Sequence, residues 1–552
     1  MAKYNARSGQ DIWDITLQKF GDVENVFDLL DDNTAKSIDD EIISGEEFII
    51  LAENKGNLRV KQALMSRESS ISNLSSSFQF VGIAFTINGN MTARTNSKSG
   101  SIMKWIIGGD TYIQNNTPAH TFSVDGSGYL TSTDGFSGIA TLNLDSQNLT
   151  SVNMISVDDL AGDIRMHNNP ALESLIFGTS TNVITRLWVY NTGISILDIR
   201  GLTAISGEIL AFGNTSMVSA LFPETYGLIT KFNVSDSYIT SLDLSTLYAL
   251  SGDIQIHGCP DLISVTMPVS VEIITACEMY ENTSMVIADL SGLSKLGGSV
   301  RFYQCSAMSS ILFPTSSQAT TALRVDQCNV TGTLDWSGMT GMAGDVRCGD
   351  NPLLSAINNP ISSGAITKYY SYNTAIEELD LSDLTGIRSD IRIYGNSLLD
   401  TLTLPAISAN VDTFQAQSCA WVTLDVSNIT GLGGNLYFYS CATLTSVIFP
   451  STTRAFSDIR GYSSNLGYID FTPMSACTEV NNSSIRLENN NMTAAEVNQI
   501  LVDFDGIATG SFTGRVINLG GTNAAPDGTS GGYDGLTAKS SLISKGFTVT
   551  TN

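Results

Sequence analysis

The sequence contains neither a long hydrophobic run nor an apolar stretch at its start. A membrane-spanning helix needs about 18 or more consecutive apolar residues, and none of the 552 residues belongs to such a run. The opening segment Met1–Arg7 is polar, whereas a secretory signal peptide has an apolar core. We therefore predict no membrane span and no cleaved secretory leader.

Basic residues are scarce, with 28 Lys and Arg against 54 Asp and Glu and a net charge of −26. Binding to nucleic acid requires a basic surface that neutralises phosphates, so we predict no nucleic-acid partner. High solubility is the simplest explanation of the excess acid. Of the three histidines, His167 and His257 fall at equivalent repeat positions but are separated by four coils, too far apart to share one metal ion.

Catalytic signatures are also missing. The patterns H-E-x-x-H and C-x-x-C do not occur. The Gly-rich segment 520–535 is not followed by the Gly-Lys of a phosphate-binding loop, so a turn-rich connection is predicted there. Paired carboxylates for glycoside hydrolysis stay open, but nothing indicates a particular pair. We predict that the chain is not an enzyme and uses no cofactor or metal.

Repetition dominates residues 141–491. A Leu-Asp-hydrophobic-Ser run recurs at steps of 45 or 46 residues. Two further sets of small polar residues or cysteines recur at the same steps. The last of these sets lies 23 residues after the one before it. Each long period therefore contains two coils of 22 or 23 residues. The members of these three sets are Asn153, Asp198, Asp243, Asp289, Asp335, Asp380, Asp425 and Asp470; Asn169, Asn214, Cys259, Cys305, Asn351, Asn396 and Cys441; and Thr192, Ser237, Asn282, Cys328, Thr374, Cys419 and Ser464.

A hydrophobic-x-hydrophobic-x-x pattern precedes the second and third sets, as in Ile164–Asn169 and Leu323–Cys328. It resembles the leucine-rich-repeat consensus L-x-L-x-x-N/C. The resemblance implies an α/β-solenoid of about 15 coils, in which a short parallel strand is followed by a small inward residue that bonds the neighbouring coil. The recurring Asp is predicted at a surface turn rather than in a row of calcium ligands.

The eight cysteines fit this repeat. Five occupy the inward sets, Cys277 and Cys348 fall on inward strand positions, and Cys477 lies in the last coil. Adjacent coils bring Cys305 near Cys328 and Cys419 near Cys441, but their side chains run parallel, which is unsuited to a disulfide. We predict eight free, buried thiols and assembly in a reducing cytoplasm.

The flanking segments have different compositions. Residues 1–66 resemble a LysM domain of the kind found in phage tail and baseplate proteins, although Leu51 replaces the usual Pro. Residues 67–77 form a Ser-rich linker. Residues 78–140 are β-rich and resemble a PKD-type or Ig-like sandwich, predicted to cap the solenoid. Residues 492–552 resemble the C-terminal cap of bacterial and phage leucine-rich-repeat proteins, with Thr493 and Glu496 as a capping box.

The two x positions of each coil strand are predicted to face solvent on the concave side of the solenoid. The fifteen pairs hold 7 of the chain's 16 Arg and 9 of its 18 Tyr, with only Glu278, Asp326 and Glu488 as acids, which predicts a local charge of about +4. Packing of Arg on Tyr between strands explains such a stripe without any ligand; alternatively it forms a binding surface. The predicted ligand-binding residues are Arg165, His167, Trp188, Tyr190, Tyr280, Arg301, Tyr303, Arg324, Arg347, Tyr370, Tyr372, Arg392, Tyr394, Tyr437, Tyr439, Arg460 and Tyr462.

The resemblances together favour a structural virion protein of a tailed bacteriophage, made in the bacterial cytoplasm and located in the tail or baseplate. In this interpretation residues 1–66 dock on other tail or baseplate proteins, and the repeat face binds a host surface glycan or protein. One alternative is a purely architectural baseplate or tail protein. Another is a bacterial surface adhesin anchored by its LysM-like domain, for which residues 1–66 would cosediment with cell-wall sacculi.

Overall fold

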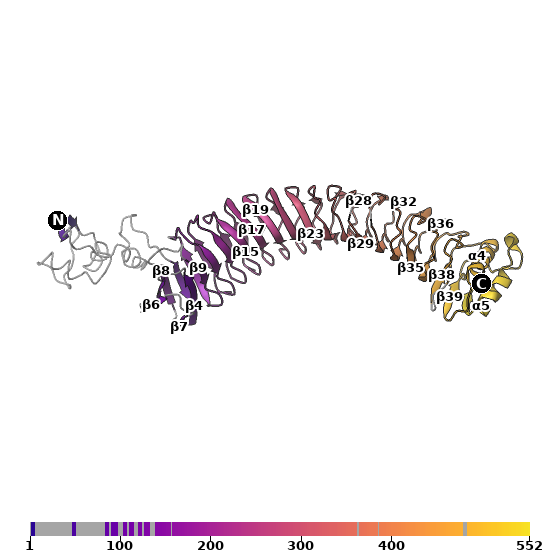
Figure 1. Ribbon diagram of the computed structural model, residues 1–552, viewed down its shortest axis with the longest axis horizontal. Helices are drawn as coiled ribbons and strands as arrows, with labels where there is room; N and C mark the ends of the chain where they lie inside the picture. Colours follow the sequence, from indigo (N-terminus) through magenta and orange to yellow (C-terminus); the bar gives the residue numbers. More distant parts are fainter. Residues whose placement is uncertain are drawn as a thin grey trace. The chain divides into compact units, whose positions relative to one another are not determined.

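The computed structural model describes most of the chain from residue 139 to its end. In that stretch it leaves out residues 156, 362–363, 385 and 479–482. Before residue 139 it describes eight short strands. The chain forms two compact units, residues 1–230 and 231–552, and each is described by itself (Figure 1).

The first sixty-six residues are described at two strands only, which pair with each other in antiparallel fashion. These strands are β1 (Ala2–Asn5) and β2 (Glu47–Ile50). The rest of the LysM-like segment and the whole Ser-rich linker 67–77 lie outside the described residues. The resemblance to a LysM domain therefore stays a prediction.

Antiparallel strands fill the described part of residues 78–140. One group pairs in the order β3-β8-β5-β6, and β4 pairs with both β7 and β9. Their bounds are β3 (Ile83–Ile87), β4 (Asn90–Ser97), β5 (Met103–Ile107), β6 (Asp110–Gln114), β7 (His120–Ser123), β8 (Gly126–Ser132) and β9 (Ile139–Asn143). Strand β3 also pairs antiparallel with β10 (Leu149–Met154), the first strand on the second side of the coils. Backbone groups at the start of the solenoid are thus paired with strands from this segment.

The repeats form a parallel β-solenoid of about 15 turns. In the first unit the long sheet contains β9, β11 (Gly162–Arg165), β13 (Ile184–Trp188) and β15 (Ile205–Leu210). The chain passes into the second unit within β17 (Thr225–Asn233). The long sheet of the second unit contains β19 (Leu247–Gln255), β21 (Ser270–Glu278), β23 (Leu293–Tyr303), β25 (Thr320–Asp326), β27 (Gly344–Arg347), β29 (Ile366–Tyr370), β31 (Ser389–Arg392), β33 (Val411–Gln415), β35 (Leu432–Tyr437), β37 (Phe456–Arg460), β38 (Ser484–Arg486), β39 (Arg515–Asn518) and β40 (Phe547–Thr550).

Short parallel strands also form the second side of each coil (Figure 1). In the first unit they are β10, β12 (Ser174–Phe177), β14 (Ile196–Asp198) and β16 (Ser219–Leu221). In the second unit they are β18 (Ser241–Asp243), β20 (Ser264–Thr266), β22 (Ile287–Asp289), β24 (Ser310–Leu312), β26 (Gly332–Asp335), β28 (Leu354–Asn358), β30 (Glu378–Asp380), β32 (Thr401–Thr403), β34 (Thr423–Asp425) and β36 (Ser446–Ile448).

Within the described residues, the predicted α/β character is limited to the end of the chain. The α-helices of the described residues are α4 (Ala494–Ile507) and α5 (Gly535–Ser544), with a 3-10 turn η2 (Ser530–Gly532) between them. Thr493 caps α4, and Glu496 completes the capping box as predicted. The coils themselves have strands on both sides, because a coil of 22 or 23 residues closes with two short strands and two turns.

Apolar side chains fill the space between the two sheets of each coil. Ile164, Leu187 and Val346 are fully buried strand residues, and such burial contributes roughly 1.5–3 kcal/mol per side chain. All eight cysteines are free and buried, as the repeat positions predict.

The inward small residues bond the neighbouring coil. Asn396, which is fully buried, donates from Nδ2 to the carbonyls of Ser371 (2.8 Å) and Ile393 (3.0 Å). Its Oδ1 accepts from the backbone N–H (2.8 Å) and hydroxyl (2.9 Å) of Thr374. Thr374 belongs to the other inward set, so the two sets form one hydrogen-bonded ladder. This arrangement satisfies turn groups that the sheets leave unpaired.

A further regularity accompanies the long period. Every second coil has a residue with a positive φ, between 60° and 105°, where its long-sheet strand begins or bulges: Gly162, Gly207, Gly252, Gly298, Gly344, Ser389 and Gly434. The register of the sheet shifts beside these residues. Such a left-handed bulge favours glycine. The bulge occurs on alternate coils, so it matches the 45-residue repeat of two unlike coils.

The recurring Asp ends a strand on the second side and forms a turn there. The side chains of Asp243, Asp335 and Asp425 each accept a hydrogen bond from the N–H two residues later, at 2.9, 3.0 and 2.9 Å. Hydrogen bonding from the Ser245 and Ser337 side chains, together with these backbone bonds, lowers the pKa of Asp243 and of Asp335. The predicted surface-turn role of this repeat position is therefore confirmed.

Candidate functional site: the outer face of the long sheet

Three side chains from each long-sheet strand point outward, because side chains alternate along a strand. We call them the start, middle and end columns. In β11 they are Asp163, Arg165 and His167, and the same register continues through the parallel pairs. The middle and end columns hold all the predicted ligand-binding residues. The sequence analysis missed the start column, although hydrophobic residues alternate with it in the same way.

In the first unit, a ring stack occupies the end column. His167, Tyr190 and Phe212 stack at centroid distances of 4.4 Å each. Trp188 in the middle column has the Arg165 guanidinium 4.6 Å from its ring centroid and donates from Nε1 to Glu208. These residues come from successive coils, so the spacing between strands sets the spacing of the rings.

Asp163 in the start column neutralises the arginines of this group. Its carboxylate lies 2.9 Å from Arg165 and 3.0 Å from Arg186. Burial alone would raise the pKa of Asp163, but hydrogen bonds from Thr185 and Arg165, together with the charge of Arg186, lower it overall. Neither guanidinium is left without a carboxylate partner.

In the second unit, the end column repeats the stacked arrangement. Ring centroids lie 4.4 Å apart for His257 and Tyr280, and 4.5 Å apart for Tyr280 and Tyr303. The pairs Tyr372–Tyr394 and Tyr439–Tyr462 stack at 4.9 and 4.6 Å. The interplanar angles in these stacks are between 5° and 8°, so each ring lies face to face with its stacked neighbour.

Arginines cover other ring faces. The Arg324 guanidinium lies 4.5 Å from the Tyr303 centroid. Tyr370 lies between Arg347 and Arg392, at 4.8 and 4.7 Å. Further along, Arg460 covers Tyr437 and Arg486 covers Tyr462, both at 4.8 Å. Each contact stabilises the stack by about 0.5–1 kcal/mol where it is exposed.

Carboxylates pair with the arginines of the middle column. Arg347 makes two bonds to Asp345, at 2.8 and 2.5 Å, and Arg324 makes two to Asp326, at 3.0 and 2.8 Å. Pairing with Asp345 raises the pKa of Arg347. Ion pairs also join Arg301 to Glu278, Arg392 to Asp390, Arg460 to Asp458 and Arg486 to Glu488.

The predicted local charge of about +4 is therefore wrong for the whole face. From β19 to β38, six arginines and three acids in the middle and end columns give +3, while four aspartates and Lys368 in the start column give −3. The face of the second unit is therefore formally neutral when all three columns are counted. The sequence count omitted one outward residue per strand, and that residue supplies the neutralising aspartates Asp253, Asp345, Asp390 and Asp458.

The tyrosine hydroxyls differ between columns. In the middle column, Tyr370 donates its hydroxyl to Asp390 (2.9 Å) and Tyr437 donates to Asp458 (3.3 Å). In the end column, the hydroxyls of six half-buried tyrosines have no hydrogen-bond partner within the described residues and are not among the buried unpaired atoms: Tyr280, Tyr303, Tyr372, Tyr394, Tyr439 and Tyr462. The end column therefore presents a row of hydroxyl groups to solvent.

The phenols of Tyr280 and Tyr372 in the end column stay protonated at neutral pH. Burial, together with Tyr303, Glu278 and Glu281, raises the pKa of Tyr280 to about 12. Burial, together with Asp350 and Asp326, raises the pKa of Tyr372 to about 12. Each phenol can donate one hydrogen bond and accept others.

A glycine allows one of these rings to pack. A Cβ at Gly349 would lie 2.5 Å from the Tyr372 ring. The Tyr372 ring is thus held between the Gly349 backbone on one side and Tyr394 on the other. The Tyr372 ring can occupy this place in the row because residue 349 has no side chain.

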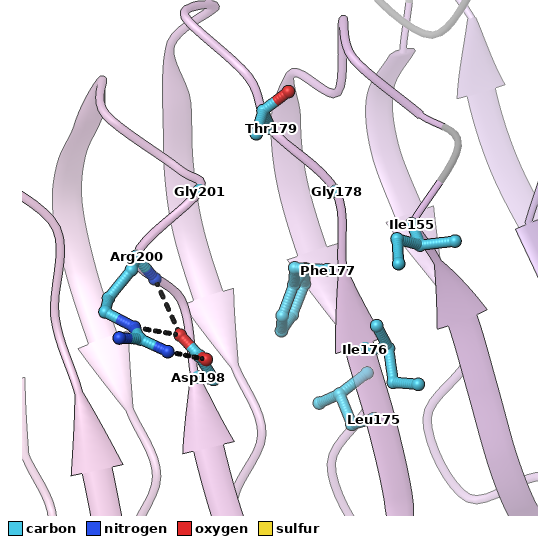
Figure 2. A pocket seen from close by; sticks show the side chains of 9 residues that line it. All are labelled: Ile155, Leu175, Ile176, Phe177, Gly178, Thr179, Asp198, Arg200 and Gly201. Carbon is cyan, nitrogen blue, oxygen red and sulfur yellow. Dashed lines mark hydrogen bonds and ion pairs between the residues drawn. The ribbon is translucent and has the colours of Figure 1, made fainter.

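The second side of the first unit has an unrelated groove of about 550 Å³. Figure 2 shows Ile155, Ile176 and Phe177 along it, with Arg200 and Asp198 at one end. Arg200 donates to Asp198 at 2.9 and 2.7 Å. The two ionisable residues of the lining neutralise each other, so the groove combines an apolar wall with a closed ion pair.

The described part of the chain lacks clustered metal ligands and membrane-spanning helices. It contains no group of three or more His, Cys, Asp or Glu residues arranged to hold a metal ion. Nor does any of its helices have the length and apolar character required to cross a membrane.

Parallel coils with an inward Asn, Cys, Ser or Thr after each long-sheet strand define the architecture. The chain has a leucine-rich-repeat-like solenoid fold. No protein-family model matches the sequence, and no curated protein matches it. Among solved structures, the solenoid is similar to the functional domain of InlJ from Listeria monocytogenes, which includes a cysteine ladder. The identity is 13% over 71% of this chain and 76% of that chain, with a TM-score of 0.23.

One buried ionisable residue of the face gives a testable pH dependence. His167 is 8% exposed, and its Nε2 lies 3.9 Å from Asp145. Burial lowers its pKa below 6.5, Asp145 opposes this, and Arg165 adds to it. The unfolded chain therefore takes up a proton first as the pH falls. We expect His167 to reduce the free energy of unfolding as the pH falls through 6.5 toward its folded pKa.

The measurement is urea unfolding between about pH 7.5 and 5 of the native protein and of His167→Phe, which keeps a ring against Tyr190. The variant should lose less stability on acidification, and its difference from the native protein should stop changing below the folded pKa. Identical pH dependence in the two proteins would contradict the assignment.

Proposed function

We propose that this chain is an attachment protein without catalytic activity, whose long-sheet face binds a host surface glycan or protein. The observation that supports this best is the end column of the second unit, where stacked tyrosines present unpaired hydroxyls in a row. Rigid aromatic residues of this kind are enriched at binding surfaces and lose little conformational entropy on binding.

We further propose that the protein is a structural component of a tailed bacteriophage virion, in the tail or baseplate. The support is the resemblance of residues 1–66 to LysM-like tail modules, which would dock on other virion proteins. The solenoid would then project its face toward the host envelope.

An adsorption experiment tests this function. Folded, purified protein should compete with the phage for host cells and reduce adsorption as its concentration rises. The double variant Tyr280→Ala with Tyr303→Ala removes two stacked rings and should compete less well. Native protein that keeps its circular dichroism spectrum but does not compete at any concentration would argue strongly against attachment.

A purely architectural role is the second candidate, and one observation favours it. The arginines of the face already bond carboxylates and cover rings within the same chain, which stiffens the sheet without a ligand. For this role, Arg301→Glu with Arg347→Glu should disrupt particle assembly, because the new carboxylates would face Glu278 and Asp345. Intact particles with reduced adsorption would instead favour attachment.

A further inference from the structure

We infer that the long-sheet face of the second unit binds a neutral, hydroxyl-rich polysaccharide rather than an acidic one. This inference rests on the proposed attachment function and specifies its ligand. Three observations support it: the pairing of the arginines, the carboxylates that act on the phenols, and the orientation of the rings.

The arginines are not available as anion-binding groups. Arg324 and Arg347 each form a two-bond pair with an aspartate of their own strand. An acidic sugar would have to displace that aspartate, and doing so would leave a carboxylate without its partner at a partly buried position. Asp326 is only 3% exposed, so the cost of leaving it unpaired is high.

Carboxylates of the same face act electrostatically on the phenols whose hydroxyls are unpaired. Glu278 and Glu281 act on the Tyr280 and Tyr303 phenols, and Asp350 acts on Tyr372. Arg301, Arg324 and Arg347 act in the opposite direction on the same phenols, but each already has a carboxylate partner. A uronic acid or phosphate placed at these hydroxyls would therefore meet carboxylates and no unpaired cation among these groups. The net charge of −26 adds repulsion at longer range. Neutral hydroxyl groups meet no such repulsion.

The ring orientation favours hydrogen bonding over apolar insertion. At least one face of each end-column ring is covered by a neighbouring ring or guanidinium group, at 4.4 to 4.9 Å. Protein hot spots depend on aromatic anchors that insert into a partner's pocket, and stacked rings cannot do this without leaving the stack. Hydroxyls and ring edges remain for the ligand, which suits a polymer of alcohol groups.

Repetition also matches a polymer. Tyr280 with Tyr303, Tyr372 with Tyr394 and Tyr439 with Tyr462 are three similar hydroxyl pairs from one sheet, with about 4.8 Å between adjacent strands. A chain of identical sugars can repeat one set of bonds along such a row, and several weak contacts then add to a useful affinity.

The test uses the full chain and a panel of purified bacterial surface polysaccharides, neutral and acidic. Each acidic member is also tested after chemical reduction of its carboxyl groups to alcohols. We expect binding to neutral members, with an affinity that changes less than about 2-fold between about 0.05 and 0.5 M NaCl, because little charge is involved. Carboxyl reduction should preserve or increase binding.

Conservative variants connect the binding to the hydroxyls. Tyr280→Phe with Tyr303→Phe keeps the stack and removes two hydroxyls, so affinity should fall about 10-fold, as expected for two neutral hydrogen bonds. The matched control is Tyr238→Phe, an exposed tyrosine outside the three columns, which should bind normally.

Three outcomes would overturn the inference. Binding confined to acidic polysaccharides and lost on carboxyl reduction would leave attachment intact but reverse the ligand class. Binding to host cells that is destroyed by protease and not by periodate would identify a protein ligand instead. Failure of the folded protein to bind any polysaccharide or any host cell would overturn the attachment function as well.

Discussion

Replacing Gly298 by alanine should lower the free energy of unfolding by about 3 kcal/mol or more. Gly298 has φ +60°, and a Cβ there would lie 1.8 Å from the Thr275 carbonyl oxygen of the preceding coil. That oxygen belongs to the backbone of an adjacent sheet strand, so it cannot move without breaking the register on both sides of the bulge. Urea unfolding of native and variant protein measures the effect.

Gly332→Ala is the matched control. Gly332 also has a positive φ (+69°), but nothing lies within 4 Å of an added Cβ. The substitution should therefore cost only the conformational preference, about 1 kcal/mol. Equal losses in the two variants would show that the backbone conformation alone, rather than the close approach of the preceding coil, decides the requirement for glycine at position 298.

Replacing Asn396 by alanine should destabilise the protein by about 3 kcal/mol, because buried groups that lose a hydrogen bond cost about 1–3 kcal/mol each. The carbonyls of Ser371 and Ile393 would lose their donor, and Thr374 would lose its acceptor. In a solenoid each coil contacts mainly its neighbours, so hydrogen exchange should quicken first in the coils that contain Thr374 and Asn396.

The control for Asn396 is Asn435→Ala. Asn435 lies in the start column, half-exposed, on the outer face of β35, and its loss should change stability by less than about 0.5 kcal/mol. A similarly small effect at Asn396 would mean that water replaces the amide, and the ladder would then contribute little to holding the coils together.

The sequence predicted the register of the solenoid because burial acts at every coil. Ile164, Val346 and Ile459 must be apolar to fill the interior, and Asn396 or Cys441 must be small to enter the turn. These demands repeat at every coil, so they appear in the sequence as a period. The outward position of Arg347 and Tyr370 follows from the same alternation.

The charge of the face could not be obtained by counting two outward positions per strand. Whether Asp345 reaches Arg347 depends on where the strand begins to bulge, and the bulge at Gly344 sets the direction of the Asp345 side chain. Glycines equivalent to Gly344 recur at the 45-residue period. The sequence could therefore have indicated where the strands bulge. The helical part was also overestimated, because leucine-rich coils of this length close equally well with strands on their second side.

The sequence by itself determined the coil length, the inward and outward positions, the free buried cysteines and the capping box at Thr493 and Glu496. These depend on periodic burial and on contacts within a few residues. Only the tertiary structure decided which groups of the face are free. Stacking of Tyr280 on Tyr303, and pairing of Arg301 with Glu278, join residues about one coil apart. Because such contacts depend on side-chain orientation across neighbouring strands, the local sequence does not specify them.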